Sequence, residues 1–398
     1  MIRSALLLCA ALLAAGCVYQ AASTPPPARA PLYKPLVPPA PASLYKSISL
    51  CDAPTFVASV KVLNASYTPK VPQGQYSPPY GQVDDNATTN LRSEIKNDLS
   101  DAFTNAPPFF KTRLCSLDGI YISPRGCTGD VNNCNIASGE DVFLNSWGFR
   151  DWISSGADNG KKYIAISAGL WPNDGTGHSH ALLFSQSQEV LLQRLITWSE
   201  PHPHVAGTGT DPDTSWMTIL ASLAYEFGHI HWVATTIRNP GDTTSDFSRL
   251  NLCGFFNYWQ YNNPKQLQPP NRWRAFRNRD TSNGVPIDHR YLPTNDDFDD
   301  ATLTSDEKND LFFLLYEPNK PWPSYFGALT PDEQFVETYV FHVLVGNQLD
   351  YATTPYLKSL PVLISYTDGS THVVDIPNDF WSGTGKPALY SKMACIPS

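Results

Sequence analysis

The sequence predicts an α+β fold built from two largely apolar helices with polar faces, a small mixed sheet and disulfide bonds. The first of these helices, at residues 222–232, carries Glu226 and His229 on one face. The second, from residue 330 to about 345, carries two glutamates one turn apart. Short apolar runs such as residues 163–167 predict the strands.

The chain begins with the features of a bacterial export signal. Arg3 precedes an apolar run at residues 5–15 that is too short to cross a bilayer. Residues 13–16, Leu-Ala-Ala-Gly, stand directly before Cys17 and resemble a lipobox. The resemblance implies that residues 1–16 are removed and that lipid on Cys17 anchors the protein to a membrane of the cell envelope. An ordinary signal peptide is the alternative.

A tether and one globular domain are expected to follow. Residues 17–46 are rich in Pro and Ala, which favours a semi-rigid extended tether. The domain is expected over residues 47–398, with its motifs within residues 160–346. Residues 241–300 read as an irregular insertion, and residues 362–376 read as a β-hairpin with an Asp-Gly turn.

Local patterns predict further elements along the chain. Alternating apolar residues at 56–62 predict a first strand. Apolar residues spaced by four from Leu91 to Phe103 predict an amphipathic helix. Asp211 and Thr330 are expected to cap the two polar-faced helices. Other helices are expected at residues 188–198 and 305–316, and short ones near residues 255–261.

Composition excludes some partners and suggests a compartment. The 398 residues are 42% hydrophobic and 16% charged, enough to bury a sizeable core. A net charge of −9 argues against a nucleic-acid partner, which needs a basic face. Nothing in the sequence indicates the oligomeric state.

Cysteine usage also suggests export. Of the 8 cysteines, those other than Cys9 and Cys17 form an even set that suggests disulfides in an oxidising compartment. Cys127 and Cys134 could close a small loop. Cys51 and Cys395 could join the two ends of the domain.

The run Tyr-Glu-Phe-Gly-His at residues 225–229 carries a family resemblance. It resembles the His-Glu-Phe-Gly-His helix of the gluzincin clan of zinc metallopeptidases, and the helix with Glu333 and Glu337 resembles the clan's second helix. The resemblance covers about residues 160–346 and implies a zincin-like domain. Gly228 adds to it, because a mid-helix glycine costs about 1 kcal/mol relative to alanine and suggests close approach of another segment.

The resemblance also implies roles for individual residues. His229 and Glu333 would bind zinc. Glu226 would act as general base on a metal-bound water, and Glu337 would support a metal ligand. Tyr325 stands near the position where one branch of the clan has a tyrosine that binds the oxyanion; an ordinary buried aromatic is the alternative.

Tyr225 departs from the clan's pattern, which has the first histidine ligand at this position. Tyr225 could bind zinc as a phenolate, at a cost of about 3 pKa units, or about 4 kcal/mol, near pH 7. His178 or His180 could supply the missing ligand, whereas His231 points to another side of the helix. In a third account the metal is lost, and Tyr225 hydrogen-bonds a glutamate of the second helix.

These accounts leave the function open between classes. With zinc bound, the protein would hydrolyse peptide bonds through a metal-bound water. Without it, the same scaffold would be a pseudopeptidase, a non-catalytic lipoprotein that binds a peptide, a protein or cell-wall material. In a third possibility both motifs are only core packing in a structural surface protein.

Overall fold

A computed structural model describes most of the expected domain. The described residues are 51–67, 79–134, 147–150, 161–172, 180–206, 214–236, 259–261, 273–275, 301–316, 323–328, 331–344 and 360–376, together with Lys392 and Ile396. The predicted signal, Cys17 and the tether lie outside these ranges, as do the predicted helix caps Asp211 and Thr330. None of the helices in these ranges is long and apolar enough to cross a bilayer.

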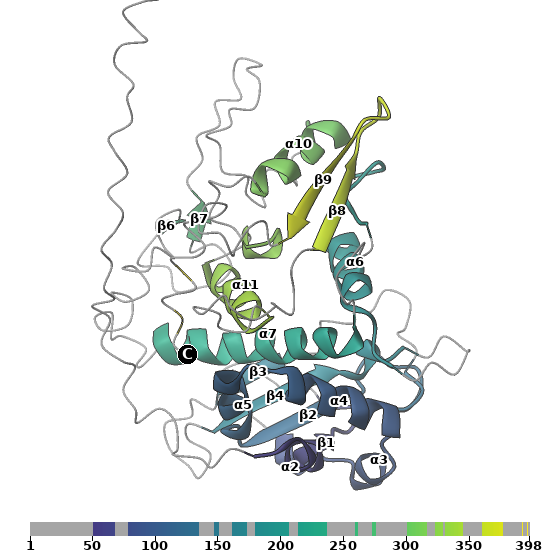
Figure 1. Cartoon of the computed structure of the whole chain (residues 1–398), viewed down its shortest axis with the longest axis vertical. Coiled ribbons are helices and arrows are strands. Elements are labelled where there is room, and N and C mark those ends of the chain that lie inside the picture. The colour runs from purple at the N-terminus through teal and green to yellow at the C-terminus, as the bar shows by residue number, and fades with distance from the viewer. Residues whose placement is uncertain are drawn as a thin grey trace, which may run out of the picture. The chain divides into compact units, whose positions relative to one another are not determined.

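A small mixed sheet forms the base of the fold (Figure 1). Its strand order is β1 (Val60–Val62), β2 (Gly119–Ser123), β4 (Lys162–Ser167) and β3 (Trp147–Arg150). β1, β2 and β4 are parallel, and β3 pairs antiparallel with β4. Every residue of β4 is buried, as expected for a strand covered on both faces. The predicted mixed sheet is therefore confirmed.

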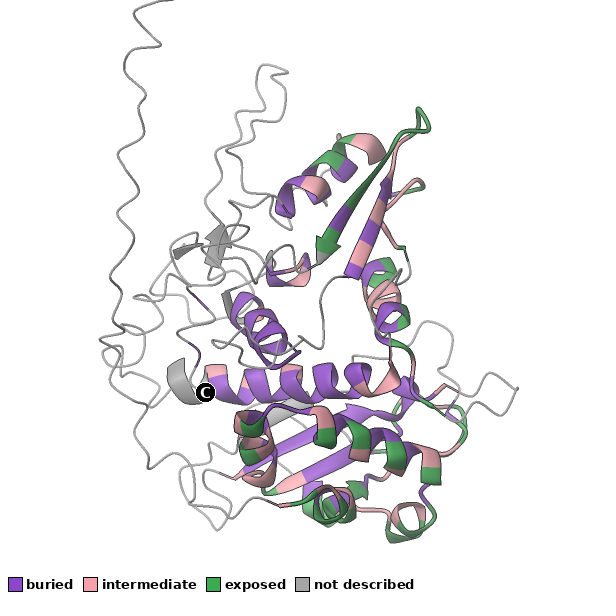
Figure 2. Ribbon diagram, viewed as in Figure 1, coloured by how far each residue is buried: buried purple, intermediate pink, exposed green. Residues whose placement is uncertain are grey.

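Helices pack over this sheet and join it to one core. α4 (Ser93–Asn105) contacts both α2 (Ala53–Ser59) and α7 (Ser215–Thr236), and it buries the predicted stripe that includes Ile95 and Leu99. In Figure 1, α7 lies between the sheet and α11 (Pro331–Leu344). Figure 2 shows that the described residues of α7 and α11 are mostly buried. One continuous hydrophobic cluster includes residues from the sheet and all these helices.

The predicted strand at residues 56–62 is wrong over most of its length. Residues 53–59 form helix α2, and only residues 60–62 are strand. Asp52 caps the helix by accepting a hydrogen bond from the Thr55 N–H, and a proline stands in the first turn. Phe56 stacks on Phe103 of α4 with ring centroids 4.6 Å apart. Capping and this contact outweigh an alternation that covers only a few residues.

A second sheet carries the predicted C-terminal hairpin. β8 (Leu360–Ser365) and β9 (Thr371–Ile376) pair antiparallel, and Gly369 takes the positive φ of 84° that its turn requires. β5 (His204–Val205) adds a short third strand beside β8. The predicted hairpin is confirmed.

The predicted helices at residues 188–198 and 305–316 are also present. They correspond to α6 (Phe184–Leu195) and α10 (Ser305–Leu315), and a capping box formed by Thr304 and Glu307 starts α10. A further helix, α5 (Pro108–Cys115), follows α4.

The predicted insertion is described only in part. Residues 259–261 form β6 (Trp259–Tyr261), which pairs antiparallel with β7 (Trp273–Ala275), so the prediction of helix at this point is wrong. Aromatic residues such as Trp259 and Tyr261 favour strands.

Two disulfides are present among the described residues. Cys127–Cys134 is the predicted short loop. Cys51 bonds Cys115, which corrects the expected pairing of Cys51 with Cys395. The reason is tertiary: Cys51 stands just before α2 and Cys115 ends α5, and the fold brings these two points together. Cys253 and Cys395 lie outside the described residues.

Candidate functional site

The candidate site lies where α7 and α11 cross, and Gly228 marks the point of closest approach. A Cβ atom at this position would stand 3.2 Å from Val336 Cγ1 and 3.3 Å from its Cα. Such distances are too short for ordinary packing. The glycine therefore lets the two helices approach closely, as the sequence suggests.

The crossing brings three predicted site residues together. The Tyr225 hydroxyl donates a hydrogen bond of 2.7 Å to Glu333 Oε2. His229 Nε2 lies 3.9 Å from Glu333 Oε1, and the Tyr225 and His229 rings meet edge to face with centroids 4.9 Å apart. Tyr225 and His229 come from successive turns of α7, and Glu333 comes from α11. The helical spacing of Tyr225 and His229 and the close approach of α11 to α7 together bring the three side chains into contact.

Glu337 lies one turn after Glu333 and is held from the opposite side. Ser324 Oγ donates a hydrogen bond of 2.7 Å to Glu337 Oε2. The Gly327 N–H in turn donates to Ser324 Oγ, so the short helix η5 (Phe326–Ala328) supports this contact. Burial raises the pKa of Glu337 to about 7, and the hydrogen bond from Ser324 partly opposes the shift. The hydrogen-bond partner of the Glu337 carboxyl group is therefore Ser324.

A cavity of about 360 Å³ opens beside the crossing. Its apolar wall includes aromatic side chains of α6, η5 and α11: Phe184, Phe326 and Phe341. Its polar wall contains the predicted site residues Tyr225, Glu226, His229, Glu333 and Glu337. A pocket with apolar walls and a few converging polar groups is typical of a ligand site.

The ionisation of Tyr225 decides what this site can hold. Burial raises the pKa of Tyr225 well above its ordinary value, and the negative charges of Glu333 and Glu337 raise it further. The phenol therefore stays protonated and acts as a hydrogen-bond donor. A metal ligand must instead offer a free lone pair from a deprotonated group.

The remaining donors do not complete a metal site at the crossing. In the described part of the chain, no three ligand atoms of His, Cys, Asp or Glu side chains come within reach of one ion there. The residues at the crossing therefore do not fit a zinc ion held by three protein ligands.

His180 lies too far away to replace the missing ligand. Its Nδ1 lies 3.0 Å from Oδ1 of Asp98, a carboxyl that is 2% exposed. Asp98 also accepts hydrogen bonds from Trp171 Nε1, the Ala181 N–H and Ser215 Oγ. Ser215 begins α7, about 15 Å along the helix from Tyr225. The account in which His180 joins the site is therefore wrong, and His178 lies outside the described residues.

Two other predicted residues lie in the core. His231 is buried and stacks with Phe335 at 5.7 Å between ring centroids, on a different side of α7 from the site, as predicted. Tyr325 is 3% exposed and packs on Phe312 at 5.9 Å. Its neighbour Phe326, not Tyr325, lines the cavity. The position of Tyr325 fits the alternative of an ordinary buried aromatic.

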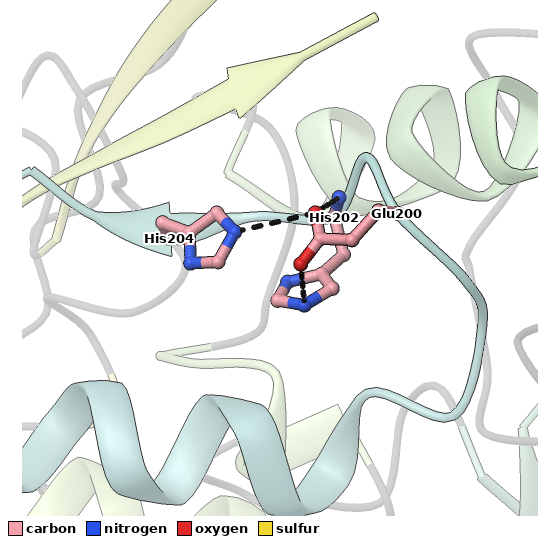
Figure 3. A group of neighbouring side chains, drawn as sticks. All are labelled: Glu200, His202 and His204. Atoms are coloured by element: carbon pink, nitrogen blue, oxygen red, sulfur yellow. Dashed lines mark hydrogen bonds and ion pairs between the residues drawn. The ribbon is translucent and has the colours of Figure 1, made fainter. Parts of the chain in front are cut away.

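A second polar cluster, not predicted from the sequence, is formed by Glu200, His202 and His204 (Figure 3). Ligand atoms of the three side chains all lie within 4.8 Å of one another, so the cluster could hold a metal ion. The signal was available, because alternate residues of an extended segment share a face and the intervening residues Pro201 and Pro203 favour extended backbone.

Comparison with known proteins adds no relative. No family model, curated protein or solved structure matches the chain.

Proposed function

We propose that this protein is an envelope-anchored lipoprotein with a zincin-like domain that binds a ligand at the α7–α11 crossing and does not hydrolyse it. The observation that carries the proposal is the hydrogen bond from Tyr225 to Glu333. It joins the two helices at the point where the resemblance to the gluzincin clan expects a metal ion. A protonated phenol thus takes the place of a metal ligand.

The loss of a ligand changes the chemistry of the whole site. Glu226 is 3% exposed and lines the cavity, the position that a general base would need. A general base alone contributes only part of the rate enhancement of a metallopeptidase, because the metal supplies the activated water. The pocket itself is kept, and this combination is that of a pseudopeptidase.

The cavity indicates the kind of ligand that it binds. Three carboxyl groups, those of Glu226, Glu333 and Glu337, line the cavity together with aromatic side chains. Carboxyl groups accept hydrogen bonds from an amino or amide N–H group, and aromatic side chains pack on an apolar neighbour of that group. A peptide, including the peptide part of cell-wall material, combines both features.

Restoring the missing histidine tests this proposal. Tyr225→His is expected to bind one equivalent of zinc more than the wild-type chain, because the new imidazole joins His229 and Glu333. The additional zinc should disappear in the double variant Tyr225→His, Glu333→Ala. Tyr225→Phe is the matched control, since it removes the hydroxyl without adding a ligand. Calorimetric zinc titration of the full chain measures the stoichiometry.

The contrary result would be a wild-type protein that already binds zinc at the crossing and hydrolyses peptides. If wild-type zinc is lost in Glu333→Ala and peptide hydrolysis is lost in Glu226→Gln, the protein is a zinc peptidase and the binding proposal is rejected.

The anchor is tested separately from the site. Cys17→Ala is expected to move the protein from the membrane fraction to the soluble fraction, because lipid is attached at this thiol. Cell fractionation with metabolic labelling by a radioactive fatty acid measures both effects. A wild-type chain that carries no label would contradict lipidation.

A further inference from the structure

We propose that Glu200, His202 and His204 form a binding site for a divalent transition-metal ion of the zinc class, separate from the α7–α11 crossing. Glu200 and His202 lie between α6 and β5, and His204 is the first residue of β5 (Figure 3). Two imidazoles and one carboxylate are a donor set that zinc and related ions prefer. The proposal does not depend on the function proposed for the crossing.

The hydrogen bonds of His204 determine which of its nitrogens faces the cluster. Its Nδ1 lies 2.9 Å from Glu189 Oε1. That carboxylate oxygen already accepts a hydrogen bond from Gln193 Nε2, and the other oxygen accepts from the Val205 N–H. Glu189 is thus an acceptor, so Nδ1 of His204 must carry the proton. In the neutral ring, Nε2 is then left with a free lone pair.

The same reasoning applies to His202. Its Nδ1 lies 3.2 Å from the carbonyl oxygen of Pro203, which can only accept. With the proton on Nδ1, where it can be donated to this oxygen, Nε2 of the neutral ring carries the lone pair. Both Nε2 atoms face the Glu200 carboxylate, at 2.7 Å from His202 and 3.5 Å from His204.

This arrangement places acceptors against acceptors unless a positive charge lies between them. One divalent cation satisfies both nitrogens and the carboxylate of Glu200 together. Donor atoms of a tetrahedral zinc lie about 3.3 Å apart. Glu200 is 67% exposed, so its side chain can move outward to this spacing.

Buried contacts hold the segment in place before any ion binds. Asn309, which is 0% exposed, donates hydrogen bonds to the carbonyl oxygens of Pro201 and Ser365. β5 pairs with β8, where His204 stands opposite Leu363. The backbone on both sides of His202 is therefore fixed by the core, and a pre-organised site loses less entropy on binding.

Glu189 acts as a positioning residue. It bonds the outer nitrogen of His204 from α6 and so sets the tautomer and ring orientation, the role that carboxylates take behind metal-bound histidines. The His204 side chain is 40% exposed and that of His202 is 16% exposed. The cluster is thus open on the side of Glu200, where water can complete the coordination.

Zinc titration of the full chain, first freed of metal with a chelator, tests the proposal. The wild-type protein is expected to bind one equivalent, and His202→Gln and His204→Gln should each abolish binding. Glu189→Gln should weaken the affinity by about 10- to 100-fold while keeping the stoichiometry. His372→Gln, the same change at an exposed histidine, and Glu333→Ala, at the α7–α11 crossing, should bind zinc like the wild type.

A measurement on the unaltered chain guards against variants that fail to fold. In NMR spectra of protein labelled with ¹⁵N-histidine, one equivalent of zinc should shift Nε2 of two imidazoles that keep a proton on Nδ1. The proposal is overturned if no histidine shifts at millimolar zinc. It is equally overturned if a folded variant that lacks both histidines still binds one equivalent, or if binding is lost in Glu333→Ala alone.

Discussion

At the scale of single residues, Tyr225 determines the chemistry of the α7–α11 crossing. A histidine there would offer a lone pair to a metal, whereas the partly buried tyrosine donates a hydrogen bond to Glu333. A histidine at position 225 would thus share a cation with Glu333, whereas the tyrosine is a hydrogen-bond partner of Glu333. The helices and the cavity around it need not change.

The buried carboxyl group of Glu337 is expected to make the stability of the folded chain depend on pH. Its pKa is raised from 4.5 to about 7 by burial, so the folded chain keeps this proton after the unfolded chain has lost it. The stability that the protonated group contributes is complete below about pH 4.5 and is lost as the pH rises through about 7. Glu337→Gln removes this loss and can still accept from Ser324, so above pH 7 it should be more stable than wild type by up to about 3 kcal/mol.

Urea unfolding at several pH values measures the effect of Glu337→Gln. Asp101→Asn, an exposed carboxyl on α4, is the control and should follow the wild-type pH profile. If Glu337→Gln loses stability between pH 4.5 and 7 in parallel with the wild type, burial of a charged Glu337 is not the cause.

At the scale of elements, helices were easier to predict than the first strand. Leu91 to Phe103 repeat over several turns, and this long periodic signal identifies α4. The alternation at residues 56–62 spans too few residues to separate a strand from a short capped helix. The cap at Asp52 was the better signal, because its side chain accepts a hydrogen bond from an N–H group in the first turn of the helix, which has no partner within the helix.

The close approach of α7 and α11 is expected to make stability sensitive to the size of the side chain at position 228. Gly228→Val is expected to lower the free energy of unfolding by roughly 2–3 kcal/mol, because the added atoms meet Val336 at the crossing. In a Val336→Ala background the loss should be smaller, since part of the clash is with the Val336 side chain. Urea unfolding of the four chains completes the cycle.

Gly81→Ala provides the control for this prediction, because a Cβ at that position meets nothing within 4 Å. Its effect should be small. Equal losses for Gly228→Val with and without Val336 would mean that the crossing adjusts by another route.

At the scale of the whole molecule, the two disulfides should differ in their contributions. Cys51–Cys115 spans 64 residues and Cys127–Cys134 spans 7. Loop entropy predicts a loss of about 4 kcal/mol when both cysteines of the long loop are changed to serine, and about 2.5 kcal/mol for the short loop. Chemical denaturation of the two double variants measures the difference; a larger loss from the short loop would contradict the entropic account.

The sequence predicted which residues of α7 and α11 belong to the candidate site, but not the contacts that they make. The positions of Tyr225 and His229 on one helix face follow from helix geometry, and so does the spacing of Glu333 and Glu337. The partner of Glu337 could not be read in the same way, because Ser324 reaches it from a separate turn. The assignment of Tyr325 to the site shows the limit of spacing alone, since its neighbour Phe326 faces the cavity.

The sequence by itself determined the elements whose signals are local: α4, α10, the C-terminal hairpin and the two polar-faced helices. Backbone periodicity and caps act within a few residues, so these signals are complete in the sequence. Only the tertiary structure decided that Tyr225 donates to Glu333, that His180 serves Asp98, that Cys51 bonds Cys115 and that Glu189 orients His204. Most of these partners are tens of residues or more apart along the chain, and only packing of the helices against the sheets selects one partner among many.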